Sequence, residues 1–377
     1  MKDIKELRKE IDAIDDEMIP LFESRMDVAK QVAEYKRAAG ATVLQSGREK
    51  EVLDLAVARL KDKSYANEAR DFMTAVMDLS KEVQLKTNPV EQTERERKPF
   101  LSSAKVGYQG TKGSYSNQAA EEYFGKEDDL TAYHSFEDVF RAIDSGEIAY
   151  GVVPLENSSV GSVVEVYDLL GRYNCFIVGE KWIRINHCLL GVKGAKISDV
   201  KTVYSKGEAL GQAHDFLAKG GFNLVSYANT ALAAEMVAEK GDKSLAAVAA
   251  ESAAKIYGLD VLAKGINSDR ENFTRFIVIS KTLSDSEADK VSVSFTLNNE
   301  SGALYKVLRF FSRYGINMVK IESRPLKNNP GSYYFVVDLE GNCKSKDMIQ
   351  ALYYVEKSTI NFKLLGEYVK SAPQEDK

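Results

Sequence analysis

Apolar residues recur along the first part of the chain at alternating steps of three and four. They fall at Ile4, Leu7, Ile11, Ile14, Met18, Leu21, Val28, Val32 and Tyr35. This spacing predicts a long helix whose apolar stripe is buried against other helices. Two shorter helices are expected over about residues 48–61 and 67–86, and a kink is expected at Pro20. Because three such helices cannot enclose a core alone, the natural arrangement is a dimer of interlocked long helices.

The pattern changes after this all-helical segment, which we place at residues 1–87. Residues 88–103 lack apolar periodicity and carry a charge run with two prolines, which is typical of a linker. Residues 104–281 alternate short β-type runs with helical stretches, which predicts an α/β domain long enough for two lobes with a cleft. Residues 290–370 follow the ferredoxin-like order βαββαβ. We therefore expect a multidomain protein.

Composition narrows the function classes. The 377 residues are 28% charged and 44% hydrophobic, as in globular proteins, and the net charge of −5 does not favour nucleic-acid binding. Cys175, Cys188 and Cys343 lie far apart and are expected to be reduced thiols of a cytoplasmic protein. The charged N-terminus does not resemble a signal peptide, and no apolar run is long enough to span a membrane. The histidines share no spacing, so neither a metal site nor a cofactor is expected.

A cation interrupts the apolar stripe of the first predicted helix. Arg25 stands where the pattern requires an apolar residue, and Lys36 follows on the same helix face. Polar residues of the other two helices can join them, namely Arg48, Glu49, Ser80 and Gln84. Together they predict a cationic pocket among apolar helices, which would suit a small dicarboxylate. The alternative is that Arg25 and Lys36 only reach solvent or pair with nearby acidic residues.

The segment LRKEIDAIDDEMIPLFESRMDVAKQVAEYK, followed by GREKE and SKEVQ, resembles the all-helical chorismate mutase family over residues 4–86. That family rearranges chorismate to prephenate by positioning the substrate and stabilising charge in the transition state. By this resemblance, the substrate-binding residues of the family correspond to Arg8, Arg25, Lys36, Arg48, Glu49, Ser80 and Gln84. It implies that Lys36 and Gln84 donate to the ether oxygen. Gln45 stands where the family commonly has an acidic residue, and its amide could still bind the substrate hydroxyl.

Arg8 and Arg25 are seventeen residues apart. In a continuous helix this separation is about 25 Å, too long for both side chains to hold one chorismate molecule. Arg8 is therefore expected to come from a partner subunit, in agreement with the interlocked dimer of the family.

Three polar segments mark the predicted α/β domain. They are GTKGSYSNQAA (110–120), VVPLENSSVGSV (152–163) and NFTRFIVIS (272–280). Each has an ordinary structural explanation, respectively a helix N-terminus, a capped turn and a β-forming threonine. Taken together they resemble the GxxGSYS, P-x-EN and TRF signatures of prephenate dehydratases, and the resemblance spans residues 105–280.

Prephenate dehydratases expel water and carbon dioxide from prephenate, leaving an aromatic ring. The resemblance implies that Thr274 assists departure of the hydroxyl, either as the acid or only as a hydrogen-bond donor. It also implies that Arg275 binds a substrate carboxylate. Further residues expected to contact the substrate are Ser114, Ser116, Asn157 and Ser158. His187 is expected to have a structural role or to support the residues that contact the substrate.

The last segment is similar to the amino-acid-sensing ACT domain that follows prephenate dehydratases. In that family the GAL and ESRP segments form phenylalanine sites at a subunit interface. The corresponding effector-binding residues are Gly302, Ala303, Leu304, Glu322, Ser323 and Arg324. A purely dimerising module is the alternative.

These resemblances imply a cytoplasmic bifunctional enzyme of phenylalanine biosynthesis. It would convert chorismate through prephenate to phenylpyruvate under feedback inhibition by phenylalanine, as a homodimer or higher homo-oligomer without nucleic-acid or membrane partners. One alternative is a monofunctional dehydratase with a weakened mutase or an ACT domain that has lost its ligand. Another is a two-lobed sensor, similar to periplasmic binding proteins, without catalysis. The lack of a recognisable signal peptide or helix-turn-helix argues against the sensor.

Overall fold

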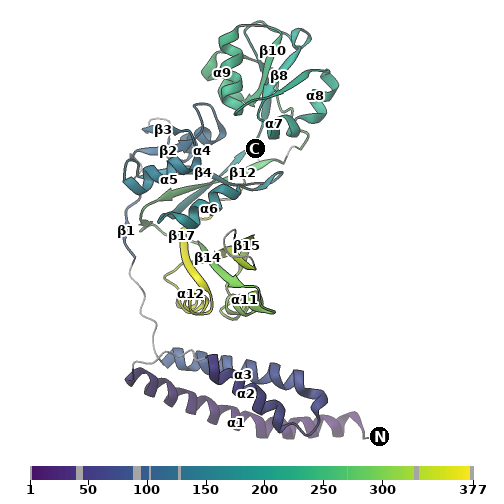
Figure 1. Ribbon diagram of the computed structural model, residues 1–377, viewed down its shortest axis with the longest axis vertical. Coiled ribbons are helices and arrows are strands. Elements are labelled where there is room, and N and C mark those ends of the chain that lie inside the picture. Colours follow the sequence, from purple (N-terminus) through teal and green to yellow (C-terminus); the bar gives the residue numbers. More distant parts are fainter. Residues whose placement is uncertain are drawn as a thin grey trace. The chain divides into compact units, whose positions relative to one another are not determined.

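The computed structural model describes residues 2–39, 46–87, 95–101, 103–125, 129–269, 271–326 and 331–373. Contacts divide the chain into two compact units, Met1–Thr93 and Glu94–Lys377 (Figure 1). None of the described helices is both long and apolar enough to cross a bilayer.

The first unit is entirely helical. It consists of α1 (Ile4–Ala38), α2 (Ser46–Arg59), the 3-10 turn η1 (Lys63–Tyr65) and α3 (Ala66–Thr87). A capping box between Asp3 and Glu6 starts α1, which then runs without a break through Pro20. Packing of α3 against both α1 and α2 holds the unit together.

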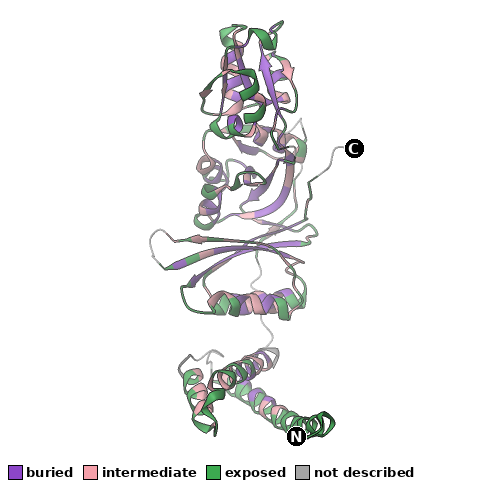
Figure 2. Cartoon of the chain, turned by 90° about the vertical axis from the view of Figure 1, so that its right-hand side faces the viewer, coloured by how far each residue is buried: buried purple, intermediate pink, exposed green. Residues whose placement is uncertain are grey.

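Most of the apolar stripe of α1 is exposed in the single chain. Within α1, only Met26, Ala29 and Ala33 are buried. By contrast, Ile14 and Leu21 are 58% and 71% exposed, and Figure 2 shows the same exposure along the N-terminal part of the helix. A row of large apolar side chains in water is unfavourable, so this surface has the character of an interface.

The second unit is built around two sheets. The larger, ten-stranded sheet has the order β15 (Met318–Pro325), β16 (Ser332–Glu340), β14 (Lys290–Asn298), β17 (Ile360–Tyr368), β6 (Phe176–Arg184), β12 (Phe273–Ser280), β4 (Tyr150–Asn157), β2 (Val106–Gln109) and β3 (Leu130–Tyr133), with β5 (Gly161–Ser162) on β4. The smaller has the order β11 (Asp260–Ala263), β7 (His187–Gly191), β10 (Leu245–Ala250), β8 (Thr202–Ser205) and β9 (Asn223–Ser226). A short ladder joins β1 (Arg97–Lys98) to β13 (Leu283–Ser284).

The chain leaves the larger sheet after β6, builds the smaller sheet, and returns with β12. This route produces the two lobes that the sequence predicts, and two chain crossings join them. Helices α4 (Tyr115–Phe124), α5 (Phe136–Ser145) and α6 (Val164–Arg172) belong to the first lobe. The second contains α7 (Gly207–Gln212), α8 (His214–Gly220), α9 (Thr230–Lys240), α10 (Glu251–Tyr257) and the 3-10 turn η2 (Ile197–Asp199). Apolar β10 is buried from end to end except at Leu245, which is typical of a central strand.

The C-terminal part has the predicted order βαββαβ, with α11 (Ala303–Arg313) and α12 (Lys346–Ser358) as its helices. Its sheet is continuous with that of the first lobe, because β17 pairs in parallel with β6 at Gly366 and Ile177. A Cβ at Gly366 would collide with the backbone of Ile177, so only glycine permits this approach. The multidomain class predicted from the sequence is confirmed.

Candidate active sites

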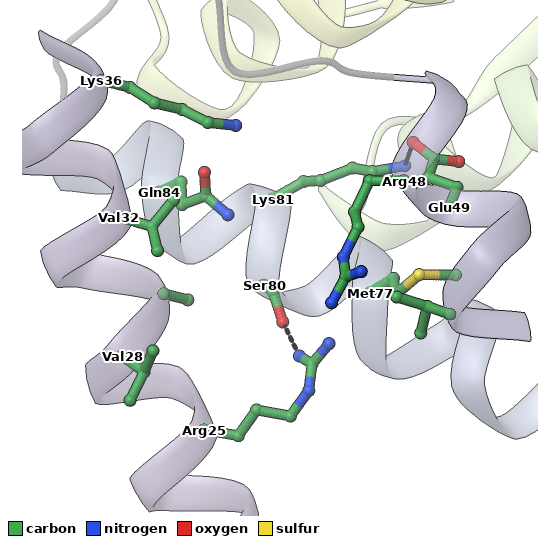
Figure 3. Close-up of a pocket in the computed structure, with 12 residues that line it drawn as sticks. Arg25, Val28, Val32, Lys36, Arg48, Glu49, Met77, Ser80, Lys81 and Gln84 are labelled. Atoms are coloured by element: carbon green, nitrogen blue, oxygen red, sulfur yellow. Dashed lines mark hydrogen bonds and ion pairs between the residues drawn. The ribbon is translucent and has the colours of Figure 1, made fainter. Parts of the chain in front are cut away.

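The three helices of the first unit surround a cavity of about 380 Å³ (Figure 3). It is lined by Arg25, Val28, Ala29, Val32, Lys36, Arg48, Glu49, Val52, Met77, Ser80, Lys81 and Gln84. Arg25 from α1 and Arg48 from α2 point toward the same region of this cavity. The predicted cationic pocket among apolar side chains is therefore present within one chain.

Arg25 is held in place by α3. Its Nη1 donates to the Ser80 hydroxyl and, at 3.2 Å, to the Val76 carbonyl. Ser80 is only 6% exposed and donates in turn to Val76 at 2.8 Å. Burial lowers the pKa of Arg25 from its ordinary value. A partly desolvated guanidinium that retains further N–H donors is well suited to bind a carboxylate.

Lys81 lines the same cavity, although no sequence motif pointed to it. Its Nζ lies 2.7 Å from Glu49 Oε1 and 3.3 Å from Asp78 Oδ1. It therefore fixes the carboxylate of Glu49, a predicted substrate ligand. Its position in the sequence could have indicated this, because Lys81 is four residues after Met77 and three before Gln84. Residues at these separations lie on one face of a helix.

The structure does not place every predicted mutase residue in this cavity. Arg8 is exposed near the start of α1 and does not line it. Gln45 lies outside the described residues. Arg48 forms an ion pair of 2.6 Å with Glu51 at the exposed start of α2.

In the second unit, Thr274 and Asn157 lie opposite each other on β12 and β4. The Asn157 side-chain amide donates to Thr274 Oγ1 at 2.9 Å and to Asn272 Oδ1 at 2.7 Å. Its carbonyl oxygen accepts from the backbone of Ser159 and Val160, both at 3.0 Å. Asn157 thus fixes the loop after β4 and the Thr274 hydroxyl together.

Two serines of the polar segments, Ser114 and Ser158, have structural partners. Ser114 caps α4, because its Oγ accepts from Asn117 N at 3.2 Å. Ser116 follows in the first turn and is 6% exposed. Ser158 ties the ends of two strands together, since its Oγ accepts from Phe273 N at 2.9 Å and donates to Glu271 O at 3.1 Å.

His187 connects the two lobes beside one of the chain crossings. Its Nδ1 lies 3.1 Å from the Tyr115 hydroxyl of α4, and its Nε2 lies 2.9 Å from Gln212 Oε1 of α7. The amide oxygen can only accept, so Nε2 carries the hydrogen and Nδ1 accepts from Tyr115. Burial lowers the pKa of His187, and the Gln212 hydrogen bond offsets part of that effect. No motif in the sequence pointed to Gln212.

Comparison with known families identifies the domains that carry these candidate sites. Family models match for chorismate mutase type II over residues 7–85, prephenate dehydratase over residues 106–284 and the ACT domain over residues 291–352. The bifunctional chorismate mutase/prephenate dehydratase of Aquifex aeolicus is 36% identical over 387 residues, covering 100% of both chains. The chain belongs to this bifunctional family.

The relative of the same name from Escherichia coli is 31% identical over 369 residues, covering 96% of this chain and 95% of its own. Among solved structures, a prephenate dehydratase in complex with L-Phe from Arthrobacter aurescens is 26% identical with a TM-score of 0.66. It covers 71% of this chain and 90% of its own. The helical domain is thus the mutase domain, the two-lobed domain the dehydratase domain, and the C-terminal domain the ACT domain.

One predicted ligand of the dehydratase domain is wrong. Arg275 was expected to bind a substrate carboxylate, but it is 1% exposed and faces the ACT strands. It donates to Glu180 at 2.6 Å, Asp338 at 2.7 Å, Glu156 at 3.1 Å and the Tyr368 hydroxyl at 2.9 Å. Neighbouring strand residues point to opposite faces, so Arg275 is directed away from Thr274.

The predicted effector residues divide between two faces of the ACT sheet. Glu322 accepts from Ser162 Oγ at 2.7 Å, and Arg324 Nε lies 3.6 Å from Asp168, so both side chains engage the dehydratase domain. Ser323 lies between them and points to the opposite face. Gly302 is the N-cap of α11, and its φ of +76° favours glycine. Within one chain, the structure therefore does not bring all six residues to one site.

Proposed function

We propose that the mutase domain rearranges chorismate to prephenate and that the dehydratase domain converts prephenate to phenylpyruvate. The cationic cavity of the helical domain carries the first half of this proposal. Arg25 and Arg48 would hold the two substrate carboxylates, while Lys36 and Gln84 donate to the ether oxygen as negative charge develops there. The reaction needs no proton transfer, so fixed donors in a partly apolar site are sufficient catalysts.

The mutase site is completed by a second subunit in this proposal. The exposed apolar stripe of α1 would be covered by α1 of a partner, and Val28 and Val32 belong to both that stripe and the cavity wall. Arg8 of each chain would then reach the cavity of the other. A homodimer is therefore a requirement of the chemistry as well as of stability.

In the dehydratase domain, Thr274 is the group that we place at the departing hydroxyl. Its oxygen already accepts a hydrogen bond from Asn157, so its own proton is available to a substrate oxygen. Thr274 is 8% exposed, and such a donor acts more strongly away from bulk water. Aromatisation supplies the driving force. Ser114, Ser116, Asn157 and Ser158 surround or support the substrate in this arrangement.

Phenylalanine would inhibit the dehydratase by binding at the ACT domain. The ACT family match and the L-Phe complex of the Arthrobacter aurescens relative support this part. The effector would contact the start of α11 at Gly302, Ala303 and Leu304, together with Ser323. Inhibition requires only that phenylalanine binds one arrangement of the domains better than another.

Separate supply of the two substrates tests this function. Purified full-length chain should convert chorismate to phenylpyruvate and should also convert added prephenate. Turnover of prephenate alone would support the monofunctional alternative. Binding of either compound without turnover would support the two-lobed sensor.

A further inference from the structure

A largely buried cluster of charged residues lies where the dehydratase and ACT sheets join. Its cations are Arg275, Lys290 and Lys320, and its anions are Glu156, Glu180 and Asp338. The dehydratase strands supply one cation and two anions, whereas the ACT strands supply two cations and one anion. The share of each domain therefore carries one unbalanced charge, negative in the dehydratase domain and positive in the ACT domain. Only together do the two domains neutralise this charge cluster, and isolated buried charges are costly.

Arg275 lies at the centre of the charge cluster. Its Nη1 donates to Asp338 Oδ2 at 2.7 Å and to Glu156 Oε1 at 3.1 Å. Its Nε donates to Glu180 Oε2 at 2.6 Å, and Lys290 donates to the same carboxylate oxygen at 2.9 Å. Charge-assisted hydrogen bonds of this kind are strong and directional. The position of the guanidinium is therefore set by both domains.

The charge cluster is directly connected to the Thr274–Asn157 pair. Arg275 follows Thr274 on β12, and Glu156 precedes Asn157 on β4. In the antiparallel register, Thr274 lies opposite Asn157 and Arg275 lies opposite Glu156. Because neighbouring strand residues point to opposite faces, the charged pair is directed to the ACT strands and the other pair away from them.

We propose that the ACT domain positions Thr274 and Asn157 for dehydration through this charge cluster, with Asp338, Lys290 and Lys320 as positioning residues. The inference rests on the proposed dehydratase activity. Lys320, which pairs with Glu156, lies on β15 together with the effector segment around Ser323. A displacement of β15 on effector binding would move Glu156 and therefore the strand end that carries Asn157. Such small displacements of a donor lower catalytic rates strongly.

Two variants of the full-length chain test the charge cluster from the ACT side. Asp338→Asn removes one of its charges. Ser292→Ala is milder, since it removes only a hydroxyl that lies 2.6 Å from both Asp338 Oδ1 and the Tyr368 hydroxyl. The matched control is Glu367→Gln on β17, which breaks a different ion pair, between the buried Glu367 carboxylate and the partly exposed Arg97 at 2.6 Å.

We expect Asp338→Asn to lower the dehydratase kcat by about tenfold to a hundredfold with KM for prephenate changed by less than about threefold. Ser292→Ala should lower kcat in the same direction by a smaller factor. Glu367→Gln should retain the kcat of the native chain per folded molecule, and the mutase rate should be unchanged throughout. Folded protein is quantified by near-ultraviolet circular dichroism.

Native kcat in both charge-cluster variants would overturn the proposal, as would an equal loss of kcat in Glu367→Gln. If Asp338→Asn does not fold, Ser292→Ala alone decides. A native chain that does not turn over prephenate would contradict the proposed function instead, so the two failures are distinguishable.

Discussion

The side-chain amide of Asn157 donates a 2.9 Å hydrogen bond to the hydroxyl oxygen of Thr274, its direct neighbour across the sheet. This bond fixes the rotation of the threonine side chain. Since the oxygen serves as acceptor, the Thr274 proton is left for another acceptor, which we identify with the departing substrate hydroxyl. Dehydration would then depend on one donor and on the residue that orients it.

Replacement of Thr274 by alanine should remove that donor. We expect the dehydratase kcat of Thr274→Ala to fall by about 10²- to 10⁴-fold, the usual contribution of a positioned proton donor. The mutase rate of the same protein should not change. Thr274→Ser, which keeps the hydroxyl, is the control and should retain most activity. Steady-state assays with prephenate and chorismate check both rates, and equal loss of both would indicate misfolding.

Replacement of Arg25 should have the opposite effect on the two activities. Arg25→Ala removes a guanidinium held by Ser80 in the cavity wall, and kcat/KM for chorismate should fall by about 10²- to 10³-fold. The control is Arg70→Ala, because Arg70 forms an exposed pair of 3.0 Å with Asp54 on the same domain. Exposed pairs contribute little, so this control should keep native mutase activity. Loss of prephenate turnover in Arg25→Ala would contradict the expectation that the mutase and dehydratase sites act independently.

The helical domain was largely predictable, because the stripe on α1 is a local pattern with a regular period. That period places Arg25 and Lys36 on one face of α1, and both line one cavity with Ser80 and Gln84 of α3. Arg275 could not be placed in the same way. Its partner Asp338 is 63 residues away in sequence, and nothing in TRF reveals which face of the strand another domain covers.

The division of the predicted effector residues has the same cause, because the sequence does not reveal which face of a strand another domain covers. Glu322, Ser323 and Arg324 are consecutive in sequence, so the motif suggested one site. A strand turns consecutive side chains to opposite faces, and the pairing of β15 decides which of them meet the dehydratase domain. Gln212 was missed because its contact with His187 depends on how the two lobes close around the chain crossing.

A mixing experiment tests whether the mutase site is shared. In a shared site, Arg8 of one chain would serve the cavity that contains Arg25 of the other. Arg8→Ala and Arg25→Ala homodimers should both be nearly inactive. After co-refolding in equal amounts, half of the dimers are mixed and each has one intact site, so about a quarter of native activity should return. A mixture no more active than its components would place Arg8 outside the site.

The pH dependence of stability provides an independent check on Asp338. Burial alone would raise the pKa of Asp338, but Arg275, Lys290 and the Ser292 hydrogen bond hold it below its ordinary value. A lowered carboxyl pKa contributes stability above the ordinary value of about 3.9, and this contribution is lost as pH falls through the lower folded pKa. The urea midpoint of native protein should therefore exceed that of Asp338→Asn at neutral pH.

The difference between those two midpoints should shrink as the pH falls below about 4, because protonated aspartate resembles asparagine. Urea titrations at stepped pH, followed by the tryptophan fluorescence of Trp182 in the second unit, measure it. A midpoint difference that stays constant into strong acid would mean that Asp338 is not charged in the folded protein.

The most direct measurement follows chorismate, prephenate and phenylpyruvate together by proton magnetic resonance in one reaction of the full-length chain. Without phenylalanine, chorismate should disappear and phenylpyruvate should accumulate. With phenylalanine, prephenate should accumulate instead, because the mutase continues while the dehydratase is inhibited. A chain that consumes no chorismate, or that forms prephenate and never phenylpyruvate, would contradict a bifunctional enzyme.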